Sequence, residues 1–238
     1  MNDSVNIRVC KSCGQSSTGN YCSNCGQALH VKRITFRSLL HDIFHLFTHL
    51  DKGFGYTVKQ LIVAPGYMQR NYIDGERTKH QKPFSMFFIC ATIAALTRYW
   101  VLKALNTYYQ SGAISEADFF HEYMVLLNIA LLPIYILITY LFFYKSKFNF
   151  AETGVLLLYA ISFIFIASTF VILLKFIWHD LDTAYIEFLI LLLYNAITFI
   201  NFYREQKRWK VLIKSVMVIT IIFFLVQITE DYIFKILY

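Results

Sequence analysis

Four cysteines near the N-terminus are the residues of this chain best suited to chemistry. They form two Cys-x-x-Cys pairs, each followed by glycine, and the eight residues from Gly14 to Tyr21 separate the pairs. Two such turns facing each other can offer four thiolates to one tetrahedral metal ion, and zinc is the usual occupant. The predicted ligands are Cys10, Cys13, Cys22 and Cys25.

This ligand set predicts a structural rather than a catalytic site, because four thiolates leave no open position for a substrate. In a reducing cytosol the spacing favours metal over disulfides. A redox dithiol and a metal-free remnant are the alternatives. We therefore expect a zinc ribbon over residues 1–30, with a structural Zn²⁺ as cofactor. Lys11 is the only lysine or arginine in residues 10–30, so we expect no nucleic-acid partner.

The rest of the chain is strongly apolar. Of 238 residues, 57% are hydrophobic and 16% charged, against about 45–50% and about 25% in soluble domains. From Phe84 onward, five stretches are long enough to cross a hydrocarbon core about 30 Å thick, which takes ~20 residues. The predicted fold is an all-α membrane protein: a bundle of about five transmembrane helices over residues 84–238, with the small ribbon at its N-terminus. A four-span bundle is the alternative. The stretches cover approximately residues 84–102, 122–144, 154–174, 184–203 and 211–229.

The charges between these stretches predict an orientation. Basic residues precede the first stretch and separate the fourth from the fifth, whereas acidic residues dominate the loop after the first. Lysine and arginine collect on the cytoplasmic side of membrane proteins. The N-terminal region has no apolar segment typical of a signal peptide. We expect a multi-pass protein of a bacterial inner membrane with a cytoplasmic N-terminus and the lipid bilayer as its first partner.

Residues 31–83 are predicted to form an amphipathic and basic segment at the membrane surface. Apolar residues recur at helical spacing over 34–50. In the same stretch His41, His45 and His49 recur every fourth residue, which allows a second metal or proton site. The alternative is a polar helix face at headgroup level. Further on, Arg70 and Arg77 are candidates for lipid headgroup or phosphate contacts, and plain anchoring by positive charge is the alternative.

Two ionisable residues fall within the predicted spans. Arg98 and Glu187 both lie near the predicted outer ends, in the first and fourth stretches. Ionisable groups inside a membrane are costly and are functional candidates by default. We expect them either to form an ion pair or to flank a shared cavity. The alternative is that each side chain reaches its own interface with water.

The N-terminal half resembles a family of bacterial inner-membrane proteins that join a four-cysteine zinc ribbon to several transmembrane helices. The resemblance implies fold and location but no activity. It covers roughly residues 10–90, and its motif residues are Cys10, Cys13, Tyr21, Cys22, Cys25, Gly26 and Gln27, then Thr57, Leu61, Pro65, Gly66, Tyr72, Gly75, Arg77 and Pro83.

Two classes of function fit these features. The favoured one is a membrane-anchored interaction or assembly module whose ribbon docks a protein partner at the cytoplasmic face or in the membrane. The alternative is a small transporter, channel or lipid-handling protein that uses Arg98 and Glu187 in the bundle. We expect no enzymatic activity, because no phosphate loop, zinc-protease motif or nucleophile elbow is present in the sequence.

Overall fold

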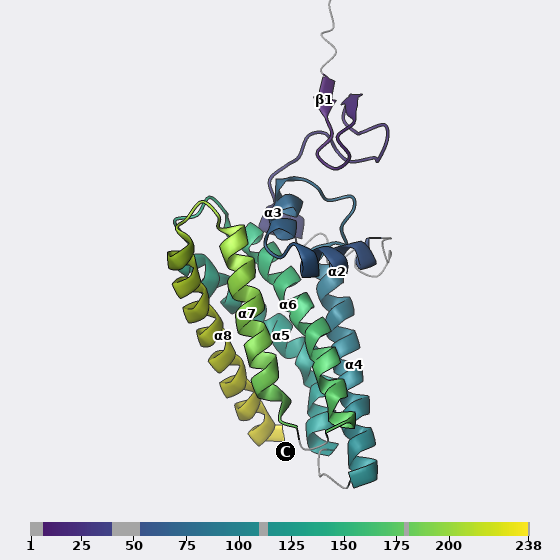
Figure 1. The fold of residues 1–238 in the computed structure, drawn as a ribbon, viewed down its shortest axis with the longest axis vertical. Coiled ribbons are helices and arrows are strands. Elements are labelled where there is room, and N and C mark those ends of the chain that lie inside the picture. Colours follow the sequence, from purple (N-terminus) through teal and green to yellow (C-terminus); the bar gives the residue numbers. More distant parts are fainter. Residues whose placement is uncertain (1–6, 40–52, 110–113, 179–180, 238) are drawn as a thin grey trace, which may run out of the picture.

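A computed structural model describes residues 7–39, 53–109, 114–178 and 181–237 (Figure 1). The N-terminal part is a small ribbon. Its strands β1 (Ile7–Val9) and β2 (Ser16–Thr18) pair antiparallel, with Ile7 opposite Thr18. A bridge between Tyr21 and Ala28 closes the second turn of the ribbon. The predicted amphipathic helix at 34–50 lies mostly outside the described residues, which include only its first turn.

Two short helices join the ribbon to the bundle. Helix α2 (Phe54–Val63) lies across one end of the bundle, and α3 (Tyr67–Asp74) stands between α2 and the ribbon (Figure 1). The turn that separates them depends on Gly66, whose φ of 83° suits glycine. Ile62 and Val63 are exposed on α2, as expected for a helix at a membrane surface.

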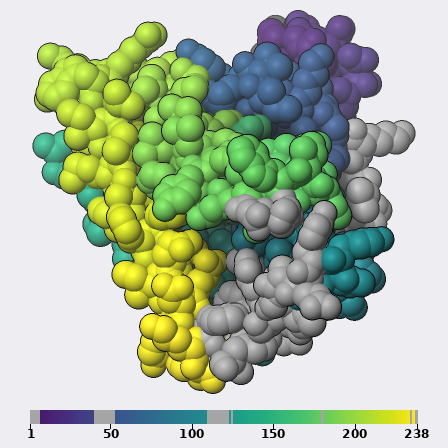
Figure 2. Space-filling model, turned by 60° about the horizontal axis from the view of Figure 1, so that its bottom comes forward, coloured from purple at the N-terminus to yellow at the C-terminus, as the bar shows by residue number. Residues whose placement is uncertain are grey.

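Five long helices form the bundle, and each contains a segment long and apolar enough to cross a membrane. This confirms the predicted fold class. Figure 1 shows them side by side, with the ribbon at one end. The other end, where α7 begins and α8 finishes, is called the distal end below; Figure 2 turns it toward the viewer. The helices are α4 (Pro83–Tyr109), α5 (Ile114–Phe142), α6 (Phe150–Leu173), α7 (Thr183–Phe202) and α8 (Arg208–Leu237), and a short η1 (Leu174–Phe176) follows α6.

Helix α6 is the centre of the bundle because it is apolar on all sides and can be buried on all of them. It packs against α4, α5 and α7, while α8 packs against α7 and α5. Helices α5, α6, α7 and α8 therefore form a closed ring, and α4 lies outside it against α5 and α6. Gly154 permits the close contact of α6 with α5, since a Cβ there would lie 3.2 Å from Ile136.

Aromatic side chains close the ribbon-side end of this ring. Phe143 and Tyr203 stack with ring centroids 4.1 Å apart, and Phe148 lies 4.3 Å from Phe202. Phe199 packs edge-on against Phe143. These five residues, called the aromatic floor below, come from the end of α7 and from the loops that follow α5 and α7. Such ring pairs add about 0.5–1.5 kcal/mol each beyond burial, so this end of the ring is firmly packed.

Candidate functional site

The four ribbon cysteines converge as the sequence predicts. Their Sγ atoms all lie within 4.8 Å of one another. Cys10 Sγ is 3.6 Å from Cys25 Sγ, and Cys13 Sγ is 3.5 Å from Cys22 Sγ. Zn–S bonds of about 2.3 Å at tetrahedral angles place sulfurs about 3.8 Å apart, so the cluster fits a four-thiolate metal site. The donor set suits zinc, although other thiophilic metals share that preference.

The glycine after each pair shapes the two metal-binding turns. Gly14 and Gly26 have φ of 77° and 72°, a region that other residues rarely adopt. Each donates its N–H to the carbonyl of the first cysteine of its pair, Cys10 or Cys22. Hydrogen bonds from the backbone N–H of Cys25, and to a lesser extent from that of Asn24, lower the pKa of the Cys22 thiol to about 6. The turn thereby favours the thiolate form of Cys22, the form that metals bind.

Hydrogen bonds join the ribbon to the segment between α3 and α4, residues 75–82, which is called the connector below. The hydroxyl of Thr78 is 2.9 Å from Gln27 Oε1 and 2.9 Å from Ser12 Oγ, and its N–H also donates to Gln27 Oε1. Lys11 Nζ donates to the carbonyl of Asp74 at the end of α3. Ser12 lies within the first metal-binding turn and Gln27 directly follows the second, so the connector touches the ribbon beside its cysteines.

Arg70, one of the two predicted headgroup contacts, is bonded within the protein. Its side chain is only 5% exposed and forms an ion pair with Glu205, in the loop between α7 and α8. It also donates to the carbonyl of Phe202, 3.0 Å away. The Arg70 guanidinium holds the pKa of Glu205 at about 2, well below its usual range. The charge of Arg70 is thus satisfied within the protein, because α3 packs against α7.

Arg77 is also used internally. Its guanidinium donates to the carbonyls of Tyr72, Lys32 and Ile73 and lies 5.8 Å from the centre of the Tyr72 ring. These bonds tie the chain that leaves the ribbon to α3. Both arginines thus form contacts within the protein, and the headgroup role stays a prediction.

Arg98 and Glu187 meet inside the bundle. Arg98 Nη1 lies 3.4 Å from Glu187 Oε1, with side chains 18% and 24% exposed. Arg98 is fifteen residues into α4, about 22 Å along its axis from the ribbon-side end. Glu187 is in the second turn of α7, at the distal end. The ion pair that the sequence suggested is therefore present in the structure.

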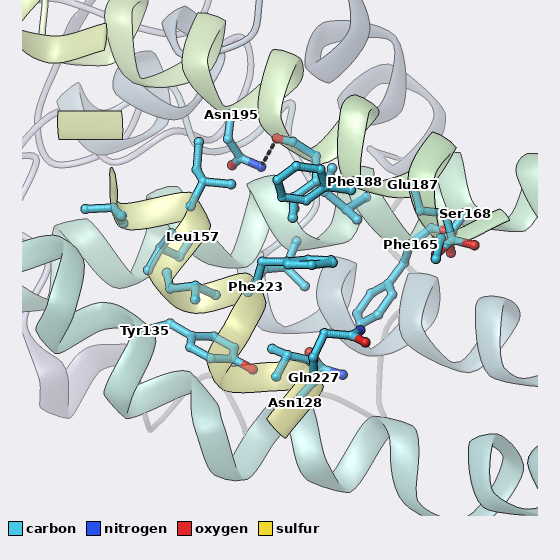
Figure 3. A pocket seen from close by; sticks show the side chains of 18 of the residues that line it. Asn128, Tyr135, Leu157, Phe165, Ser168, Glu187, Phe188, Asn195, Phe223 and Gln227 are labelled. Atoms are coloured by element: carbon cyan, nitrogen blue, oxygen red, sulfur yellow. Dashed lines mark hydrogen bonds between the residues drawn. The ribbon is translucent and has the colours of Figure 1, made fainter. Parts of the chain in front are cut away.

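The pair lies on the wall of a cavity of about 230 Å³. The cavity is enclosed by the ring of α5, α6, α7 and α8, and Arg98 reaches it from α4. Phe199, part of the aromatic floor, lines it toward the ribbon side. Figure 3 shows Glu187 and Ser168 at one end, with Phe165, Phe188 and Phe223 between them and Leu157. Its volume lies just below the usual range for small-molecule sites, about 300–1,000 Å³.

Sequence reasoning missed most of the polar groups on this wall. Asn128 and Tyr135 from α5 and Gln227 and Glu230 from α8 line the same cavity. Tyr135 is 2% exposed, and its hydroxyl has no hydrogen-bond partner among the described residues. Asn195 lines the cavity while donating to the carbonyl of Leu191 in its own helix. The sequence did offer one signal of a polar wall, because Glu230 is an acidic residue toward the distal end of an apolar helix.

His41, His45 and His49 lie outside the described residues, so a second metal or proton site there stays a prediction. Cys90, the fifth cysteine, is buried in α4 and is not part of the metal cluster.

The architecture is that of a multi-pass helical membrane protein with a four-cysteine module at its N-terminal side. The chain is similar, over residues 51–95, to the family described as protein of unknown function DUF3667. That range contains α2, α3, the connector and the first half of α4. No curated protein and no solved structure matches the chain.

Proposed function

We propose that this protein binds a small molecule in the cavity inside its helical ring and belongs functionally with transporters or lipid-handling proteins. The observation that carries this proposal is the ion pair of Arg98 and Glu187 on the wall of a membrane-embedded cavity. Charged groups inside a membrane cost several kcal/mol unless they face a partner or a polar space. A role in packing alone would be served by apolar residues of similar size.

The route to the cavity is proposed to be from the distal end. At the ribbon-side end, Phe199 and its aromatic neighbours fill the ring. Toward the distal end, the wall instead carries Arg98, Glu187 and Glu230. This asymmetry supports a binding pocket open to one side rather than a continuous channel. In this role the protein binds and does not catalyse.

The ribbon is proposed to be a cytoplasmic structural zinc module. Four thiolates within 4.8 Å of one another supply a closed coordination shell. Thr78 and Lys11 hold it in place against the connector. With the ribbon in the cytoplasm, five crossings place the distal end, and hence the cavity mouth, on the opposite side of an inner membrane.

A second candidate function is assembly with a protein partner. The ribbon leaves Ile7, Val9 and Tyr21 about two-thirds exposed, at 66%, 66% and 68%. Apolar side chains on a fastened module would suit a partner with an apolar surface. Replacing Ile7 and Val9 by serine would abolish co-purification of such a partner while leaving ligand binding in the cavity unchanged.

The test of the primary proposal is native mass spectrometry of protein extracted in mild detergent from its own membrane. Leu191 and Leu193 are on the same helix, but Leu191 lines the cavity whereas Leu193 is 52% exposed. Wild type and Leu193→Trp should retain a bound small molecule at up to one per chain. Leu191→Trp, which fills the cavity, should lose it. Equal retention by both variants, or no retention by wild type, would overturn the proposal.

A further inference from the structure

The cavity has a polar end and an apolar end, and this polarity restricts its ligand. Glu187 and Glu230 lie toward the distal end, on α7 and α8. Val218 lines the cavity twelve residues before Glu230 on α8, about 18 Å along the helix axis. Around Val218 the wall is aliphatic, with Leu157, Ile161, Ile219 and Ile222.

The charges at the polar end are of both signs. The lining residues with ionisable acidic or basic side chains are Arg98, Glu187 and Glu230, which gives a formal net charge of −1. Lys175 lies nearby, in η1, but does not line the cavity. A guanidinium suits a phosphate, and carboxylates suit an ammonium group. A ligand that carries an ammonium and a phosphate would satisfy both signs at once.

A second feature of the wall indicates a polar atom partway along the ligand. The Tyr135 hydroxyl is buried at the cavity and has no hydrogen-bond partner among the described residues. In Figure 3 it lies on the same side of Phe223 as Asn128 and Gln227. Buried hydroxyls are normally hydrogen-bonded. An ester or hydroxyl oxygen of the ligand, on the apolar side of its charged headgroup, would supply the hydrogen-bond partner of Tyr135.

We propose that the cavity binds an amphiphile with a zwitterionic ammonium–phosphate headgroup, such as an ethanolamine phospholipid or its lysolipid. The headgroup lies beside the Arg98–Glu187 pair, with its phosphate at the Arg98 guanidinium and its ammonium at the glutamates, and one acyl chain runs toward the aromatic floor. The volume of about 230 Å³ holds part of one hydrocarbon chain and leaves no room for a second. A second chain, where present, would lie outside the ring in the bilayer. This inference rests on the proposed ligand-binding function.

The experiment compares defined lipids on delipidated full-length protein by native mass spectrometry titration. Three probes carry one hydrocarbon chain of the same length: lysophosphatidylethanolamine, lysophosphatidylglycerol, which has only the phosphate charge, and a fatty amine, which has only the ammonium charge. The ethanolamine lipid should bind at least tenfold more tightly than either single-charge probe. In Arg98→Gln, the ethanolamine lipid should no longer bind more tightly than the fatty amine. In Glu187→Gln, it should no longer bind more tightly than the glycerol lipid.

Tyr135→Phe adds a readout that a structural role would not produce. The ligand-free variant should be at least as thermally stable as wild type, because an unpartnered buried hydroxyl is removed. Its affinity for the ethanolamine lipid should still fall severalfold. Lower stability with unchanged affinity would show that the hydroxyl serves packing and would contradict this contact.

The outcomes separate the two proposals. Binding that Leu191→Trp abolishes, but without preference among the three probes, would overturn the headgroup assignment and leave a ligand-binding cavity. Tighter binding of the glycerol lipid would also overturn it, in favour of an anionic headgroup. Binding unaffected by Leu191→Trp would place every probe outside the cavity and overturn both.

Discussion

The four cysteines of the ribbon predict the metal content of the protein. Four converging sulfurs are positioned to hold one metal ion per chain, and we expect zinc, so replacing one ligand should weaken the site strongly. Cys13→Ser should lower the metal content well below one per chain, measured by elemental analysis of purified protein. Cys90→Ala is the matched control, since Cys90 is buried in α4 away from the cluster. Equal metal content in both variants would contradict the four-thiolate site.

His80 links the stability of the ribbon connector to pH. The imidazole is buried between the rings of Tyr56 and Tyr72, with centroids 5.2 and 6.3 Å away. Burial, with a smaller contribution from Lys79, lowers the pKa of His80 from 6.5 to about 4. The unfolded chain therefore takes up its proton at higher pH than the folded one, and stability falls as pH drops below the unfolded value.

Between pH 6.5 and about pH 5 this loss should be about 1.5 kcal/mol, because the unfolded histidine is half protonated at pH 6.5 and almost fully protonated at pH 5. Thermal unfolding of purified protein across this range measures it. His80→Gln should flatten the dependence. The Glu205 carboxylate does not interfere, because its pKa lies at about 2 and its contribution is lost only at lower pH, below about 4.5. An unchanged pH profile in His80→Gln would count against burial of a neutral His80.

The turn between α2 and α3 sets how the connector lies on the bundle. A Cβ on Gly66 would overlap the Thr198 carbonyl oxygen of α7, and its φ of 83° strains any other residue. Gly66→Ala should therefore destabilise the protein by more than about 2 kcal/mol. Gly55, in α2, has open space around its Cβ position. Gly55→Ala should be neutral or stabilising by about 0.5–1 kcal/mol, so similar melting temperatures for the two variants would contradict this packing.

The Arg70–Glu205 pair joins α3 to the loop between α7 and α8. Because Arg70 is 5% exposed and Glu205 51%, removing the carboxylate leaves a buried guanidinium with weaker partners. Glu205→Gln should cost about 1–2 kcal/mol, less than a fully buried pair. Lys147 also contacts Glu205, at 3.3 Å, but both groups are half exposed. Lys147→Gln should thus change the melting temperature little; a larger loss than for Glu205→Gln would contradict the assignment.

The helices were predictable because each apolar run is about as long as a bilayer requires. The short helices before Pro65 and before Gly75 were predictable from the residues that end them. The ion pair of Arg70 with Glu205 was not predictable, since the two residues are 135 positions apart and both side chains resemble ordinary interfacial charges. Arg98 and Glu187 could be matched because span counting places them at similar depth. The cavity could not, since it depends on how four helices pack.

The molecule as a whole should cross the membrane five times, with the ribbon and the distal end on opposite faces. Epitope tags placed before the ribbon and after α8 test this in sealed membrane vesicles of known orientation. Protease added outside should remove one tag and spare the other, and the pattern should reverse in inverted vesicles. Removal of both tags from one side would contradict five crossings.

The claim that the ring holds a ligand is tested most directly by an experimental map of the protein in lipid nanodiscs, with a bound antibody fragment to add mass. We predict elongated density that no protein atom explains, inside the ring of α5 to α8. Its broad end should lie at Arg98, Glu187 and Glu230, and its narrow end should approach Phe199. A map in which the ring has closed, so that α8 side chains fill this space and no additional density is present, would contradict the presence of a ligand.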